Sequence, residues 1–210
     1  MAIGPLKKVA AKRAVEACGQ LELSAEARKL LDDQVSPDAY LDRLIEKEQW
    51  ADAIRVLAFA LPKREAVWWA AQCVRIHMPA DAPPKNLDAL KSAEAWVYKP
   101  TDENRWAAKE AGEKVGYDKA ACWVGMGAFW SSGSMVPAHL PKMEPGPAFT
   151  PGAVAGAILI AGAQEPERAM ENFKLALEDG LDIANGGTGK RRARGEGAAP
   201  PPPGVQPANR

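Results

Sequence analysis

The sequence predicts an all-α fold: a compact multi-helix array or orthogonal bundle of about nine helices, followed by a disordered C-terminal tail. Apolar residues recur at helical spacing along most of the chain. No run of β-branched residues alternates with polar residues, as a half-buried strand requires. Short turns that contain proline or glycine separate the helical stretches, which is typical of antiparallel helical arrays.

Two stretches without any charged side chain, 120–134 and 149–164, are predicted to form the centre of the fold. Each is apolar on all faces, so it is stable in water only if other helices cover it. With 210 residues, 47% of them hydrophobic, the chain is long enough for one well-buried domain and short for two. We therefore assign residues 1–185 to a single helical domain.

Five helices are predicted before a proline-rich break that begins at Pro79. Ser24 and Ser36 are placed to accept hydrogen bonds from the first turn of a helix, and Pro37 suits the first helical position. The fifth helix has hardly any polar face and should be mostly buried. The predicted elements are Leu6–Cys18, a helix that follows Ser24, a helix that begins at Pro37, Trp50–Leu61 and Arg64–Met78.

Three further helices and the two uncharged stretches complete the predicted fold. The sequence Lys99-Pro100-Thr101 ends one helix and begins the next, with the Thr101 hydroxyl as the cap. Asn104 stands where a full capping box would have Glu or Gln. The helices span Asn86–Tyr98, a segment from Thr101 to Val115, and Pro166–Ala184.

Charge is distributed unevenly along the chain, although the formal net charge is zero. Residues 186–210 hold five basic residues and one acidic residue, which leaves the preceding body mildly acidic. An acidic body argues against nucleic acid as the main partner. The same segment is rich in glycine and proline and contains almost nothing that could be buried, so we predict a disordered basic tail over residues 186–210.

No sequence motif points to catalysis, a metal or a cofactor. Cys18, Cys73 and Cys122 are far apart and form no C-x-x-C pattern, so we expect reduced, buried thiols. Neither histidine belongs to a zinc-binding or catalytic pattern, and no nucleophile elbow or dinucleotide fingerprint occurs. The sequence therefore predicts a protein that is not an enzyme, without catalytic residues, metal or cofactor.

No segment of the sequence has the character of a membrane span. The longest uncharged run that could be helical, 152–163, is shorter than the ~20 residues that a span needs. The start of the chain has charges in every turn and lacks the apolar region of a secretion signal. These observations predict a cytoplasmic protein with no membrane partner.

A proline-rich loop is the strongest candidate for a binding site. About 20 residues without regular structure, 131–151, interrupt the helical pattern, and such loops commonly have a function. Apolar residues are interleaved with prolines in this loop, which suits an extended, stiff conformation. Two interpretations remain open: a lid over the domain's own core, and a site that binds another protein. The candidate binding residues are Trp130, Met135, Val136, Leu140, Met143 and Phe149.

Four charged residues next to apolar positions are candidates for partly buried ion pairs that fix the register of the helices. They are Arg75, Glu94, Asp102 and Arg105. Most of the seven Trp residues lie on helix faces with Ala or Leu one turn away, which indicates core packing. The alternative is a cavity lined by Trp, in which Arg75 and Arg105 would anchor the anionic ligand of a small-molecule-binding protein or an unrecognised enzyme.

Four short motifs stand out in the predicted body. They are Trp68-Trp-Ala-Ala-Gln-Cys-Val-Arg75, Ala95-Trp-Val97 with Pro100-Thr-Asp-Glu-Asn-Arg105, Phe129-Trp-Ser-Ser-Gly-Ser134, and Gly180-Leu-Asp-Ile-Ala184. With these motifs the chain resembles, over roughly 24–186, an uncharacterised bacterial family known only as a domain of unknown function. The resemblance implies a small helical cytosolic accessory protein of Gram-negative bacteria, associated with type VI secretion gene clusters. It supplies no catalytic residues.

These observations lead to one main hypothesis about function. We expect a non-enzymatic helical adaptor or scaffold that binds another protein through the 131–151 loop and its neighbouring helices. A secretion component or effector is the kind of partner that the resemblance implies.

Overall fold

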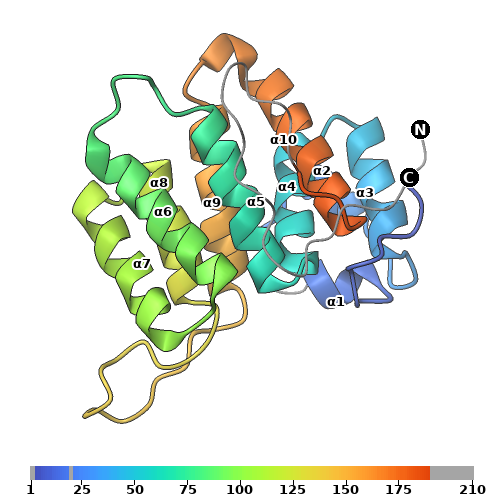
Figure 1. Ribbon diagram of the computed structural model, residues 1–210. Coiled ribbons are helices and arrows are strands. Elements are labelled where there is room, and N and C mark those ends of the chain that lie inside the picture. The colour runs from blue at the N-terminus through green and yellow to red at the C-terminus, as the bar shows by residue number, and fades with distance from the viewer. Residues whose placement is uncertain (1–2, 19–20, 190–210) are drawn as a thin grey trace.

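The computed structural model describes residues 3–18 and 21–189 (Figure 1). This part of the chain contains ten α-helices and one short 3-10 helix, joined by loops. This part contains no strand, so the predicted all-α fold is confirmed. The helices are α1 Ala14–Cys18, α2 Ala25–Lys29, α3 Pro37–Glu46, α4 Trp50–Ala60, α5 Lys63–Ile76, α6 Pro84–Tyr98, α7 Asp102–Val115, α8 Ala120–Phe129, α9 Phe149–Gly162 and α10 Ala169–Ala184, with the 3-10 helix η1 Pro166–Arg168 before α10.

Helices α8 and α9 form the centre of the array, as the two uncharged stretches predict. Helix α8 packs against α5, α6, α7 and α9, and helix α9 packs against α4, α5, α8 and α10. Nearly every residue of α8 is buried, whereas α9 buries one broad side and leaves Gly152 and Ile160 exposed on the opposite side. Figure 1 shows α6 and α7 on one side of α5, and α3 and α4 on the other. Apolar burial against several neighbours explains why helices without a polar face are stable here.

Three predicted helix caps are present. The hydroxyls of Ser24, Ser36 and Thr101 accept hydrogen bonds from the backbone N–H three residues further on, at 3.1, 3.4 and 3.3 Å. Asn104 does not complete a capping box; its side chain donates to the carbonyl of Lys99 at 2.8 Å. Thr101 and Asn104 therefore secure the start of α7 and the end of α6 within one short turn.

The first predicted helix, Leu6–Cys18, is wrong over most of its length. Only Ala14–Cys18 is helical, and the residues before it run as irregular chain. The N–H of Lys8 donates to the carbonyl of Ala184 at 2.9 Å, and the N–H of Ala14 donates to the carbonyl of Val35 at 2.7 Å. These backbone groups bond to distant parts of the chain instead of to the preceding turn, so tertiary contacts override the local helical pattern.

Helices α7 and α8 approach each other closely because of glycines. A Cβ atom on Gly125 of α8 would overlap the backbone carbonyl of Ala108 in α7. A Cβ atom on Gly112 of α7 would lie 3.0 Å from the carbonyl oxygen of Cys122. Both positions therefore need a residue without a side chain.

The first residues of the predicted tail belong to the folded body. The indole N–H of Trp68 donates to the carbonyl of Thr188 at 2.9 Å, and the N–H of Gly189 donates to Asp182 at 2.9 Å. Segment 186–189 therefore lies on α5 and α10. The rest of the predicted disordered tail, 190–210, lies outside the described residues.

Candidate functional site

Arg105 of α7 holds the beginning of the proline-rich loop. Its side chain is only 2% exposed. Its Nη1 donates to the carbonyl of Phe129 and its Nη2 to the carbonyl of Ser134, both at 2.9 Å. Its Nε and Nη2 also donate to one carboxylate oxygen of Asp102, at 2.8 and 2.6 Å. One buried guanidinium thus fixes the chain where it leaves α8.

The backbone around Arg105 is adapted to this contact. Gly133 has a φ of +71°, and a Cβ atom there would lie 3.0–3.1 Å from the guanidinium. Lys63 of α5 donates to the carbonyl of Ser131 at 2.8 Å. Two sequence motifs therefore meet at one place, because Arg105 ends one of them and residues 129–134 form the other.

Hydrogen bonds across the loop close it into a defined shape. The N–H of Met135 donates to the carbonyl of Met143 at 2.7 Å. The hydroxyl of Ser134 accepts from the N–H groups of Val136 and Met143, both at 3.2 Å. The loop projects beyond the helices at the lower left of Figure 1. It ends at Ala148, earlier than the predicted 151, because α9 already begins at Phe149.

The candidate binding residues divide into an inner and an outer group. Trp130 and Met135 are half-buried and pack on the core, and Val136 is half-buried. The outer group is exposed: Leu140 at 46%, Met143 at 54% and Phe149 at 42%. The inner residues therefore support the loop, while the outer residues present apolar surface to solvent.

A row of aromatic side chains runs from Phe149 along α8. Neighbouring ring centroids lie 5.9 Å apart for Tyr117 and Trp123, 6.3 Å for Trp123 and Trp130, and 5.2 Å for Trp130 and Phe149. Tyr117 is exposed, and both Trp residues are half-buried. We call Tyr117, Trp123, Trp130, Phe149, Leu140 and Met143 the apolar docking surface.

Sequence reasoning missed Tyr117 and Trp123 as members of this surface. A usable signal was present, because Trp123 and Trp130 are seven residues apart and share one face of a helix. The side that this face points to depends on how α8 packs, which the spacing does not reveal.

The four residues proposed for ion pairs form two pairs. Arg75 of α5 lies 2.6 Å from Glu94 of α6, and Arg105 lies 2.6 Å from Asp102 on its own helix. The first pair joins two helices near the surface. The second pair is one part of the buried hydrogen-bond set that holds the loop.

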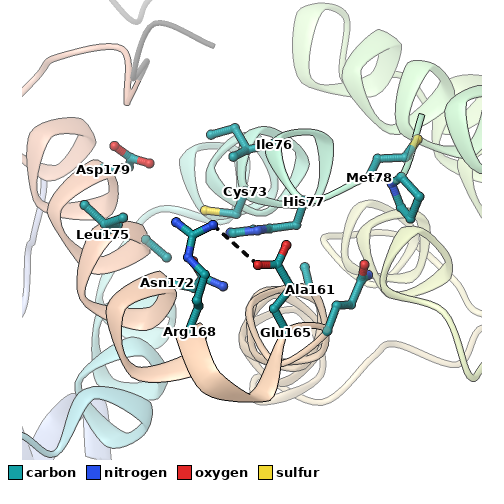
Figure 2. Close-up of a pocket in the computed structure, with 13 residues that line it drawn as sticks. Cys73, Ile76, His77, Met78, Ala161, Glu165, Arg168, Asn172, Leu175 and Asp179 are labelled. Atoms are coloured by element: carbon teal, nitrogen blue, oxygen red, sulfur yellow. Dashed lines mark hydrogen bonds and ion pairs between the residues drawn. The ribbon is translucent and has the colours of Figure 1, made fainter. Parts of the chain in front are cut away.

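Two clefts open elsewhere on the body. The larger has a volume of about 520 Å³ and lies between the ends of α5 and α9 and the stretch of α10 from Asn172 to Asp179 (Figure 2). The smaller, about 320 Å³, lies between α6 and α7 and is lined by Lys85, Asp88 and Glu110 among others. Neither cleft is lined by a Trp, by Arg75 or by Arg105. Within residues 3–18 and 21–189, no group of His, Cys, Asp and Glu is arranged to hold a metal ion.

Burial holds two of the cysteines in the thiol form. Desolvation raises the pKa of Cys18 and of Cys122 from 9.0 to about 11. Both groups are therefore protonated and weakly nucleophilic at neutral pH.

The raised thiol pKa values predict how stability changes at high pH. The fold favours the protonated form, so this contribution is complete below pH 9.0 and is lost as the pH rises through about 11. We expect the free energy of unfolding, measured by urea denaturation, to decrease over this range. The decrease should be smaller in a Cys18→Ala, Cys122→Ala double variant, and an unchanged decrease would contradict the assignment.

Comparison with known proteins gives one match. The Family of unknown function (DUF6931) matches residues 40–184. This range contains all four motifs that stand out in the sequence. No curated protein and no solved structure matches the chain. Among the described helices, none has both the length and the apolar character needed to cross a membrane.

Proposed function

The chain belongs to the Family of unknown function (DUF6931), whose description gives no activity, and from its structure we propose a non-enzymatic adaptor that binds another protein through the apolar docking surface. The observation that carries this proposal is the exposed apolar face of a loop that the body holds in place. We place the encounter in the cytoplasm, and we propose a secretion component or effector as the partner.

The chemical character of the surface favours protein binding. Leu140 and Met143 on the loop and Phe149 at the start of α9 are exposed, and the aromatic row extends from Phe149 to Tyr117. Exposed apolar side chains of this kind typically mark interaction sites, and aromatic residues and Met are enriched in the centres of interfaces. Lys142 and Glu144 form an exposed ion pair, 2.5 Å apart, so the loop adds no net charge here. We therefore expect a partner that presents apolar side chains.

The anchoring of the loop also favours binding. A flexible loop loses conformational entropy when it binds, and a loop already held in shape loses less. Here Arg105 and Lys63 hold the start of the loop, and Ser134 joins its two arms. The guanidinium of Arg105 is engaged by groups of the same chain, so its role in this arrangement is to position the loop. Binding, and not catalysis, is the function that these contacts support.

Affinity capture with matched variants tests the proposal. A Leu140→Ser, Met143→Ser double variant removes the apolar side chains at the tip of the loop. Met170→Ser is the matched control, because Met170 is 64% exposed on α10, outside the docking surface. We expect the unaltered chain and the control to capture equal amounts of one host protein. The double variant should capture roughly tenfold less of it. The proposal fails if every captured protein binds all three chains alike.

A further inference from the structure

Helix α9 has an apolar face that the described part of the chain leaves open. Phe149 is 42% exposed and Ile160 is 36% exposed. Between them, a Cβ atom on Gly152 or Gly156 would meet nothing within 4 Å in the described residues. The residues of this face lie within about 80° of one another on a helix of 3.6 residues per turn. We call Phe149, Gly152, Gly156, Ile160 and Ala163 the α9 face.

The α9 face carries no charge, which is unusual for the outward side of a helix. Helices at the surface of a globular protein typically turn an apolar stripe to the core and charged side chains to water. Residues 149–164 contain no charged side chain at all. Apolar groups that stay in contact with water lose the stabilisation that burial would give them. A partner that covers the α9 face would therefore be bound with a gain in hydrophobic free energy.

The side chains of the α9 face alternate in size symmetrically about Gly156. Phe149 lies seven residues before Gly156, and Ala163 lies seven residues after it. Gly152 lies four residues before it, and Ile160 lies four residues after it. In two antiparallel copies related by a two-fold axis at Gly156, residues at equal distances from the axis face each other. Each large side chain of one copy then lies over a small residue of the other.

The two ends of α9 are complementary in charge. The first turn of α9 has no acidic residue and no side-chain cap, and the last turn has no basic residue. Charged side chains of α9 itself therefore do not offset the partial positive charge at its N-terminus or the partial negative charge at its C-terminus. In an antiparallel pair, the N-terminus of each α9 lies beside the C-terminus of the other. An antiparallel pair thus offsets both partial charges, whereas a parallel pair would bring like charges together.

From the open face, its symmetric pattern of sizes and its complementary ends, we infer that two copies of the chain form an antiparallel, two-fold symmetric dimer through the α9 face. Glycine at the axis allows the two helix backbones to approach closely. The face is narrow compared with the roughly 800 Å² per partner of a stable interface, so the association should be reversible and depend on concentration. Dimerisation does not depend on the proposed function. Phe149 alone belongs to both surfaces, and the variants below leave it unchanged.

Sedimentation equilibrium of the full chain, at roughly 1 to 500 µM, tests for the dimer. We expect the unaltered chain to pass from monomer to dimer within this range. Gly152→Ile should weaken the association roughly tenfold or more, because the new side chain meets Ile160 of the second copy. Non-specific association through apolar surface would instead become stronger, since this substitution adds exposed apolar area.

Exchanging the large and the small residue tests the antiparallel register. Ile160→Ala alone should also weaken the association, because the space over Gly152 of the second copy is no longer filled. The double variant Gly152→Ile, Ile160→Ala again places a large side chain opposite a small one. It should therefore recover most of the association that Gly152→Ile loses. Both positions are exposed, so circular dichroism should show the same helical signal for every variant.

Ile76→Ala is the matched control, because it makes the same change as Ile160→Ala at a residue of α5 that is 43% exposed and lies outside the α9 face. It should leave the association unchanged. A chain that stays monomeric over the whole range of concentration overturns the inference. It is also overturned if Gly152→Ile strengthens the association, if the double variant associates no better than Gly152→Ile, or if Ile76→Ala weakens the dimer as much as Ile160→Ala.

Discussion

Replacing Arg105 with leucine is expected to lower the free energy of unfolding by about 3 kcal/mol, because buried carbonyl groups lose their donors. The carbonyls of Phe129 and Ser134 would have no replacement for the guanidinium. For a chain of this length, the melting temperature should fall by roughly 6–12 °C. Thermal unfolding followed by circular dichroism and urea denaturation both measure the effect.

The same substitution should free the loop before it unfolds the body. We expect faster proteolytic cleavage in the loop of the variant under conditions where the helical signal is unchanged. Arg75→Leu is the matched control, because it removes the other predicted ion pair, which is partly exposed. That pair should contribute about 1 kcal/mol or less. If the two variants lose equal amounts of unfolding free energy and their loops are cleaved at equal rates, Arg105 has no special role in holding the loop.

Gly125→Ala is expected to destabilise the protein by about 3 kcal/mol, since one added methyl group meets backbone and not a movable side chain. The new Cβ would overlap the carbonyl of Ala108, so α7 and α8 would have to separate. That separation would also disturb the buried contacts made by Arg105, which lies on α7. Urea denaturation of the variant gives the difference in unfolding free energy.

A second glycine provides a control, because its replacement by alanine is expected to change the free energy of unfolding in the opposite direction. Gly156 lies within α9, and a Cβ atom there would meet nothing within 4 Å. Gly156→Ala should therefore stabilise the protein by up to about 1 kcal/mol through helix propensity alone. If Gly125→Ala is also neutral or stabilising, the close approach of α7 and α8 is not rigid.

The helices could be predicted because their signals are local. Hydroxyl caps, prolines and apolar spacing placed α3 to α10 within a few residues of their observed bounds. Residues 6–13 have the same kind of spacing but are not helical, because Lys8 bonds to Ala184 and Ala14 to Val35. No local pattern carries information about partners so far away in the sequence.

The candidate sites could be predicted only in part. Proline and apolar residues identified the loop, and the charged residues next to apolar positions included the buried Arg105. The side chains that Arg105 meets could not be predicted, because its acceptors are backbone carbonyls, which every residue has. The larger cleft was missed for a related reason: Asn172 and Asp179 look like ordinary polar positions of an amphipathic helix until α5 and α9 pack against them.

The two adjacent indoles of α5 have a consequence for the order of folding. Trp69 donates to the carbonyl of Ala176, 107 positions away, and Trp68 to that of Thr188, 120 positions away. Each of these bonds closes a loop of more than 100 residues, and closing a loop of that length costs conformational entropy. The hairpin of α6 and α7, in contrast, closes through a turn of only a few residues. The hairpin should therefore be an early nucleus, and the seam between α5 and α10 should be the last part of the molecule to become protected from hydrogen exchange.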